Sequence, residues 1–347
     1  MLEHLTWLKG ARSAPSAHNT QPWQFRILDD GDILVLWSKE RQLYASDPTN
    51  RDLYLALGAC VESACLMAAR EGQPMTFVYS DSTDNVIGLL KKSDTTIADP
   101  ERELARLLEK RQTGRIAHEK IVVSAHVLDL MHAQAADGGF KLFVTQNKND
   151  MAQLAALSKE ATAAQFADSA VHEELWQWLR LVPGDSAYLR DGLTADCLNL
   201  HGLVLSATRA LLMPSRMRLL SKLGIHNLLS MDTEALVKKT AAMCLLTSTD
   251  LKRKTLIDGG RLLLRLWLTA CQNELTTHPV SALLDCQATV LPTAKVLNAS
   301  EQDLPIAIYR MGATKAVPRA PRLPLGELLL NYGDSSKQMG TDSNAHN

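Results

Sequence analysis

The chain has 347 residues, of which 46% are hydrophobic and 22% charged, and its 37 Lys and Arg nearly balance 38 Asp and Glu. The formal net charge of −1 gives no electrostatic footprint for nucleic acid or for an anionic membrane surface, so we expect neither as a partner. No apolar run approaches the roughly 20 residues of a membrane span, and the chain does not begin with the basic and then apolar stretch of a secretory signal. A cytoplasmic location is therefore expected.

The first eighty residues alternate helical and strand patterns. A short helix over residues 4–13 is stopped by Pro15, because proline fixes φ and removes a backbone donor. A second helix over 53–70 carries apolar residues at near-helical spacing and ends at Gly72. The strands predicted here are 24–28 and 33–37, which form a hairpin, and 75–80, after which a polar stretch follows.

The rest of the chain is predicted less evenly. Asp99 and Pro100 supply the N-cap and the first-turn proline of a helix that runs through Arg111. Residues 180–240 look irregular and are rich in methionine and arginine, and residues 331–347 are expected to form a polar, disordered tail. The other predicted elements are strands 140–145, 242–247 and 305–311 and helices 151–170 and 259–273.

A weak internal repeat links two of these helices. A shift of 201 residues places Gly58 on Gly259 and Ala69 on Ala270, and both segments precede strand-like or proline-bearing stretches. A chance match of two helices explains this equally well, and the alternative is a chain made of two related halves.

The cysteines indicate core residues in a reducing compartment, since none forms a Cys-x-x-Cys pair. Cys60 and Cys65 are five residues apart, on different faces of a helix, so a shared metal ion is not expected there. The remaining four are Cys197, Cys244, Cys271 and Cys286. The glycine-rich nucleotide-binding motifs, the nucleophile elbow and the paired-histidine zinc motif are not found in the sequence.

Residues 14–25, Ala-Pro-Ser-Ala-His-Asn-Thr-Gln-Pro-Trp-Gln-Phe, are the most informative segment. Pro15 and Pro22 interrupt regular structure, so the polar residues between them must lie on a shaped loop that opens into a strand. Composition alone also permits an ordinary polar turn. We expect His18 in this loop to act as a hydrogen-bonding residue, and the alternative role is that of a catalytic acid or base.

Basic residues gather at two other places. Arg111, Thr113 and Arg115 combine guanidinium and hydroxyl groups that suit a phosphate, although a cationic helix end that complements the helix dipole is the simpler alternative. Arg319 and Arg322 follow the last predicted strand, where a solvated basic turn is the alternative.

These motifs together resemble the nitroreductase-like flavoproteins, and the order of the motifs resembles the Acg-type branch, in which two degenerate copies are fused in one chain. The segment at 14–23 is similar to the family's Pro-Ser-x-x-Asn-x-Gln-Pro-Trp loop, which lies against FMN. Residues 260–270 and 278–281 resemble the family helix and the loop after it. The resemblance implies one FMN bound by Pro15, Ser16, Asn19, Gln21, Arg111, Thr113, Arg115, Pro279, Ser281, Arg319 and Arg322.

The resemblance also implies individual roles. Arg115 would stabilise the negative charge of reduced flavin, the Ser281 amide would approach flavin N5, and Pro279 would lie against the ring. Ala117 and His118 depart from the family pattern, because relatives often carry an aromatic residue after the arginine motif.

The expected fold is an α+β nitroreductase-like fold, with two half-repeats in one chain and helices around a mainly antiparallel sheet. Residues 1–98 are the first half, which donates the signature loop, and residues 99–330 are the second half, with a lid within 180–240. The implied function is electron transfer from NAD(P)H to a nitro, quinone or similar acceptor by a ping-pong mechanism, without a catalytic side chain or a metal ion. The alternative is a non-enzymatic FMN-binding or flavin-sequestering protein with a lid-blocked site. The intrachain pseudo-dimer is compatible with a monomer.

Overall fold

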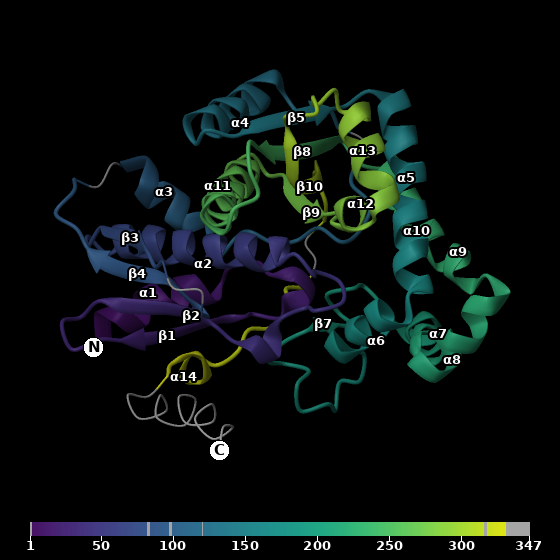
Figure 1. Cartoon of the computed structure of the whole chain (residues 1–347), viewed down its shortest axis with the longest axis horizontal. Helices are drawn as coiled ribbons and strands as arrows, with labels where there is room; N and C mark the ends of the chain where they lie inside the picture. The colour runs from purple at the N-terminus through teal and green to yellow at the C-terminus, as the bar shows by residue number, and fades with distance from the viewer. Residues whose placement is uncertain (1, 82–83, 97–98, 120, 316–317, 331–347) are drawn as a thin grey trace, which may run out of the picture.

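The computed structural model describes residues 2–81, 84–96, 99–119, 121–315 and 318–330. Two four-stranded antiparallel sheets form its framework, and helices pack against both (Figure 1). The predicted α+β class, with helices around mainly antiparallel sheets, is confirmed. The predicted tail at 331–347 lies outside the described residues.

The first sheet has the strand order β1-β2-β4-β3. The predicted hairpin is confirmed, since β1 pairs with β2 from Trp23 opposite Trp37 to Ile27 opposite Ile33. The sequence reading missed β4, because Asp and Ser residues before it and lysines at its end gave that stretch a polar, loop-like composition. The bounds are β1 (Trp23–Ile27), β2 (Ile33–Trp37), β3 (Met75–Tyr79) and β4 (Val86–Lys92).

The second sheet has the order β5-β8-β10-β9. All seven residues of β8 are buried, which explains its continuous apolar sequence. The three strands predicted in this part of the chain are confirmed, and β9 was not predicted. The bounds are β5 (Lys141–Thr145), β8 (Ala242–Ser248), β9 (Thr276–Pro279) and β10 (Leu304–Gly312).

The two sheets have the same topology. In each one the chain runs through two strands, a long helix and two more strands, and the spatial order of the strands is first, second, fourth, third. The long helices are α2 (Arg51–Arg70) and α11 (Arg253–Gln272), and a further helix precedes each sheet, α1 (Leu2–Arg12) or α4 (Ala125–Asp137). The chain therefore repeats one α-β-β-α-β-β unit.

Helices α2 and α11 lie side by side at the centre of the molecule (Figure 1). A side chain on Gly58 would overlap the backbone oxygen of Ile257, and one on Gly260 would overlap that of Leu55. An offset of 202 residues exchanges these two contacts, so Gly58 corresponds to Gly260. The predicted offset of 201, which matched Gly58 with Gly259, was wrong by one residue, because Gly259 instead faces Ile306 of the second sheet.

Glu62 of α2 also links the two helices, through ion pairs with arginines of α11. Its buried carboxylate accepts hydrogen bonds from Arg261 at 2.8 Å and from Arg265 at 2.5 Å, both on α11. Removing one partner of such a pair would leave a buried charge uncompensated, so these contacts hold the two halves in one arrangement.

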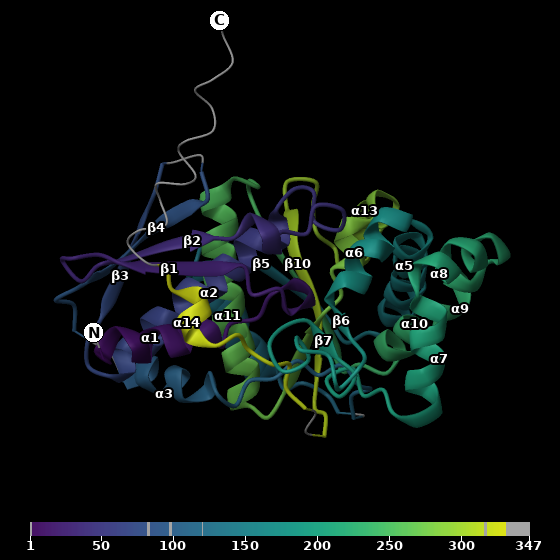
Figure 2. The same ribbon diagram turned by 90° about the horizontal axis from the view of Figure 1, so that it is seen from below.

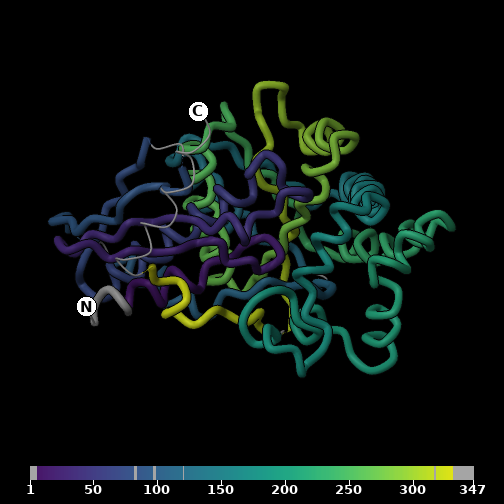
Figure 3. Tube along the Cα trace, turned by 60° about the horizontal axis from the view of Figure 1, so that its bottom comes forward, coloured from purple at the N-terminus to yellow at the C-terminus, as the bar shows by residue number. Residues whose placement is uncertain are grey.

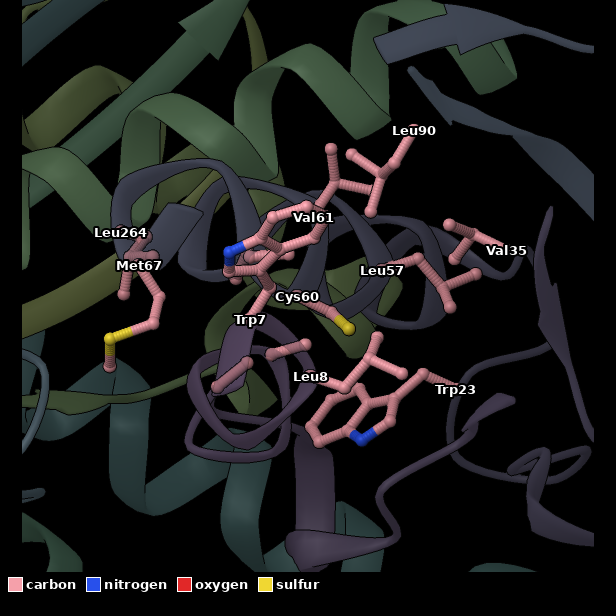
Figure 4. Close-up of a cluster of buried hydrophobic side chains, with 14 of the residues drawn as sticks. Trp7, Leu8, Trp23, Val35, Leu57, Cys60, Val61, Met67, Leu90 and Leu264 are labelled. Atoms are coloured by element: carbon pink, nitrogen blue, oxygen red, sulfur yellow. The ribbon is translucent and has the colours of Figure 1, made fainter. Parts of the chain in front are cut away.

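The core of the first half includes residues from both ends of the chain. Trp7, Trp23 and Leu57 pack together with Leu264 of α11 (Figure 4). The chain returns after the second sheet, and Leu323 joins the same cluster. The tube in Figure 3 shows this last segment running beside the first residues.

The returning segment also pairs with the first sheet. Leu329 bridges Phe25 on the free edge of β1, and the Leu330 amide donates to the Phe25 carbonyl at 2.8 Å. This contact covers an edge that would otherwise expose unpaired backbone groups.

A largely helical insert separates β5 from β8 and has no counterpart between β1 and β2, which are joined by residues 28–32. It occupies one end of the molecule (Figure 2). The expectation that residues 180–240 are irregular was wrong. Short helices broken by Gly202, Pro214 and Gly224 give no long periodic pattern to recognise. The elements are α5 (Lys148–Ala167), α6 (Ser169–Trp178), β6 (Leu179–Arg180), β7 (Leu193–Thr194), α7 (Gly202–Leu212), α8 (Pro214–Leu220), α9 (Ile225–Leu229) and α10 (Met231–Lys238).

Short helices complete the fold. The helix predicted over 99–111 ends at Leu107, so the Arg111 motif lies in the loop that follows it. The other elements are α3 (Asp99–Leu107), α12 (Ala282–Asp285), α13 (Gln287–Val296), α14 (Leu325–Leu328), and the 3-10 turns η1 (Ala17–Asn19), η2 (Lys39–Arg41) and η3 (Ser221–Leu223).

By length and composition, α2 is the single described helix that would be able to cross a membrane, which the reading of apolar runs had not noticed. In this fold 89% of its apolar window is buried inside the protein. The six cysteines are free thiols; three are buried and Cys65, Cys271 and Cys286 are partly exposed.

Candidate functional site

The signature loop, residues 15–22, is held in an unusual backbone conformation. His18, Asn19 and Gln21 have φ values of 47°, 56° and 51°, in the left-handed region that residues with side chains seldom adopt. The Ser16 hydroxyl accepts a hydrogen bond from the Gln21 amide at 2.9 Å and closes the loop, which begins at Pro15. Strain of this kind persists only where surrounding contacts hold it.

Two side chains of the loop supply those contacts. The Asn19 side-chain amide donates to the carbonyls of Gly192 at 3.0 Å and Pro321 at 2.9 Å. The buried side-chain amide of Gln21 donates through its nitrogen to the Arg190 carbonyl at 3.0 Å. Its side-chain oxygen accepts a hydrogen bond from the Leu323 backbone amide at 2.8 Å. Both residues thus join the loop to the insert and to the returning C-terminal segment.

An arginine cluster lies behind the loop, made of Arg12, Arg111, Arg115, Arg319 and Arg322. Burial, followed by the positive charges of its neighbours in the cluster, lowers the pKa of Arg322 to about 9. Burial is also the main cause that lowers the pKa of Arg111 to about 10. Each of the five raises the local positive potential, so the cluster favours a bound anion.

The contacts of these arginines leave hydrogen-bonding capacity unused. Arg322 donates to the Asn19 side-chain oxygen at 2.8 Å and to the Ala14 carbonyl at 3.1 Å. Its Nε and the Nη1 of Arg111 are buried without a hydrogen-bond acceptor. Within the described ranges, none of the five forms an ion pair with a carboxylate. A phosphate would satisfy both the donors and the charge.

The loop that carries Arg111 is tied to the second sheet. Thr113 bridges Thr277 of β9, and the Gly114 amide donates to the Thr277 carbonyl at 3.1 Å. Arg115 is half-buried, and burial lowers its pKa. The chain thereby brings Arg115 next to the signature loop, since Arg115 is one of the charged neighbours of His18.

Two residues of this site escaped the sequence analysis. Arg310 of β10, 1% exposed, donates to the carbonyls of Gly114 and Ile116 and, through Nε, to His278 at 2.9 Å. Burial and the charge of Arg310 hold the pKa of His278 well below its usual range, so His278 stays neutral and accepts this hydrogen bond. The signal was available, because Arg310 interrupts an otherwise apolar strand.

The remaining predicted residues lie around this centre. Pro279 ends β9 opposite Tyr309, and Ser281 caps the short helix α12, whose Asp285 faces α2. Arg319 is exposed, at the rim of the cluster. The structure therefore brings together the signature loop, the Arg111 loop and the returning segment, while Pro279 lies on β9, which pairs with the Arg111 loop through Thr277, and Ser281 lies at the start of α12.

An aspartate cluster joins the two halves beside this site. Arg51 donates to Asp52 and to Asp285, each at 2.7 Å, and the Asp47 carboxylate accepts from the Leu53 amide at 2.8 Å. Burial first, and then the charge of Asp52, raises the pKa of Asp47 to about 7 and that of Asp285 to about 7. One cation thus serves three carboxyl groups.

Replacement of Asp47 by asparagine is expected to flatten the pH dependence of stability. The folded pKa of Asp47 lies above its usual 3.8, so its contribution is complete below about pH 4 and is lost as pH rises through about 7. Asparagine keeps the acceptor for Leu53 without this loss. Urea unfolding measures the free energy of unfolding of the variant and of wild type at each pH. The difference between variant and wild type should be about 1–3 kcal/mol more favourable to the variant at pH 8 than at pH 4. An equal difference at both pH values would contradict the assignment.

No protein-family model matches the chain. Over 176 residues it is 28% identical to the "Putative NAD(P)H nitroreductase Rv3131" of Mycobacterium tuberculosis H37Rv, in an alignment that covers 50% of each protein. It is 28% identical over 170 residues to the "Putative NAD(P)H nitroreductase acg" of the same strain, covering 48% of this chain and 50% of that one. The chain spans about half the length of the curated relatives that it matches.

Among solved structures, the FMN-dependent nitroreductase NfnB from Mycobacterium smegmatis in complex with NADPH shares 19% identity, with a TM-score of 0.40 over 66% of this chain and 97% of that one. The fold assignment rests on the two four-stranded sheets of this chain and not on that similarity. The sequence relatives confirm the resemblance predicted from the motifs: the chain is related to nitroreductase-like proteins. Within that class, acg is one of its relatives.

Proposed function

We propose that the chain is an FMN-dependent oxidoreductase that transfers electrons from NAD(P)H to a nitro, quinone or similar acceptor by a ping-pong sequence. The arginine cluster, with its two orphaned buried donors, is the observation that carries this proposal. Bound FMN would supply the redox chemistry, accepting hydride from the nicotinamide and returning electrons to the acceptor. The relatives named as NAD(P)H nitroreductases support the same assignment.

The residues divide the work of holding this cofactor. Arg111, Arg322 and Thr113 would bind the phosphate, with Arg319 at the rim. Arg115 would face the end of the ring where negative charge develops, and Arg310 holds the Arg115 loop in place through two carbonyls.

The signature loop and the second sheet would enclose the ring. In this proposal Pro15 and Ser16 contribute loop backbone on one side, Pro279 and the Ser281 amide lie on the other, and Asn19 and Gln21 act by fixing the loop. Residues 1–98 and 99–330 would remain the two functional halves, with the proviso that residues 318–330 pack on the first.

We expect about one FMN per chain. Residues 13–22, which include the signature loop, connect α1 to β1, whereas the equivalent connection between α4 and β5 is only residues 138–140. The second half therefore lacks a loop for a second site. Reconstitution with FMN, denaturing release and chromatography measure the ratio; two flavins per chain would contradict this asymmetry, and none would overturn the cofactor assignment.

Anaerobic mixing of the reconstituted protein with NADH and with NADPH tests the activity itself. Bleaching of the flavin absorption on mixing, and its return on addition of a quinone or nitro compound, is the expected result. Retention of FMN without reduction by either nucleotide would exclude the proposed enzyme.

A flavin-sequestering protein is the second candidate, because the insert lies on the signature loop. Residues 188–197, which we call the lid segment, are tied there through the Gly192 and Arg190 carbonyls and by Asp191. Asp191 pairs with Arg41 at 3.1 Å and Arg180 at 2.6 Å. Within the expected lid range of 180–240 we therefore propose residues 188–197 as the lid, since Leu212, further along the insert, contacts His172 of α6 instead.

Asp191→Asn separates these candidates. If the native site is blocked, the variant should show a large increase in the rate at which the nicotinamide reduces the flavin. If the native protein is the proposed enzyme, the variant should lose turnover or acceptor selectivity, because closure excludes water and positions the acceptor. Stopped-flow reduction rates give the readout, with Glu173→Gln, which breaks an exposed ion pair with Arg218, as the control. Unchanged rates with FMN still bound would contradict any gating by the lid segment.

A further inference from the structure

The insert contains a groove that shares no lining residue with the arginine cluster. It has a volume of about 530 Å³ and lies between α6 and β6 on one side and α7 and α8 on the other. These helices form the end of the molecule away from the first sheet (Figures 1 and 2). A volume of this size is in the range of small-molecule sites.

The walls of the groove are mainly apolar. Trp176 and Leu179 line the groove, as do Val182 and Met213, which are each 40% exposed. An aromatic ring and a flexible thioether adapt well to a flat or linear apolar ligand. The exposed portions of Val182 and Met213 would be covered by such a ligand.

The polar part of the lining is cationic. Arg180, Arg209 and Arg216 line the groove against a single carboxylate, Asp185. Arg180 is already committed to Asp191, with which it forms two hydrogen bonds. The Asp185 carboxylate accepts the Ala187 amide at 2.8 Å and faces its own turn.

The other two guanidinium groups are available. Arg216 makes one hydrogen bond, to the Ala210 carbonyl at 3.2 Å. The Arg209 side chain forms neither a hydrogen bond nor an ion pair with any described residue. Two planar guanidinium groups that line one groove favour a carboxylate or a sulfonate, which accepts paired N–H bonds.

We propose that this groove binds an amphipathic monoanion, a carboxylate or sulfonate on an aromatic or aliphatic body. Arg209 and Arg216 hold the anionic group, and Trp176, Leu179 and Met213 cover the apolar body. The site lies on the insert and needs neither FMN nor nicotinamide.

Fluorescence titration of the full chain with 1-anilinonaphthalene-8-sulfonate tests the site directly. Saturable binding is expected, and Arg209→Ala together with Arg216→Ala should weaken it by about tenfold or more, the range for hydrogen bonds to charged groups. Lys222→Ala, a cation of the same helical region outside the groove, should leave affinity unchanged. Equal losses in the control, or unaltered binding in the double variant, would overturn the proposal.

Displacement from wild-type protein provides a test that does not depend on the folding of any variant. 2-Naphthoate and decanoate should each compete with the probe, and the tighter of the two identifies an aromatic or an aliphatic body. Neutral 2-naphthamide should compete at least about tenfold more weakly than 2-naphthoate. Equal competition by the amide would show adventitious apolar binding only. Both measurements are independent of whether the chain binds FMN.

Discussion

Replacing Arg111 with alanine is expected to weaken FMN binding by about 1.5–3 kcal/mol, the range for hydrogen bonds to charged groups. Arg111 is 6% exposed, and one of its terminal nitrogens has no acceptor. Riboflavin, which lacks the phosphate, should bind almost as well to the variant as to wild type. Titration of both flavins by fluorescence quenching measures the difference.

The same substitution should not lower the stability of the cofactor-free protein. The Arg111 side chain lies among like charges and makes one long hydrogen bond, to the Ser13 carbonyl at 3.5 Å, so its removal relieves repulsion. Arg106→Ala is the matched control, since Arg106 is an exposed arginine paired with Glu103. Equal losses for FMN and riboflavin, or a large fall in the unfolding temperature of the apoprotein, would assign Arg111 to the fold instead. Arg322→Ala should cause a similar loss of FMN but also loosen the loop through Asn19.

Gly260→Ala is expected to destabilise the protein by about 3 kcal/mol, because the added methyl group meets the backbone of Leu55 and the two central helices must separate. Gly58→Ala should cost a similar amount, since the repeat relates the two positions. Urea unfolding followed by far-ultraviolet circular dichroism gives the measurement.

Gly184→Ala supplies the reference, because nothing lies within 4 Å of a side chain at that position. Its effect should stay within about 0.5 kcal/mol. If Gly260→Ala behaved like Gly184→Ala, the close approach of α2 and α11 would be wrong.

Local patterns predicted much of the fold. The hairpin at β1 and β2 followed from a turn between two apolar runs, and β8 followed from a continuous apolar run. The repeat was visible only as a few glycines, because two halves that share a topology need not share residues. Its register became clear when the contacts of Gly58 and Gly260 were seen to exchange.

The candidate site was predictable where the chain provides local motifs. The signature loop and the Arg111 loop were found in this way, and the structure places them beside Arg322. Arg310 and His278 were missed because their partnership depends on the pairing of β10 with β9, which no local spacing reveals. The contacts of Asn19 and Gln21 with residues 190–192 likewise depend on where the insert lies.

The returning segment has a consequence for synthesis on the ribosome. Residues 1–92 emerge first, yet Leu323 fills their core and Leu329 covers the edge of β1. Domains generally fold as they emerge, from the N-terminus onward. The first half therefore cannot complete its core until residues 318–330 have been synthesised. Docking of this segment also brings Arg322 to Asn19, so the arginine cluster is completed only after both halves have been synthesised.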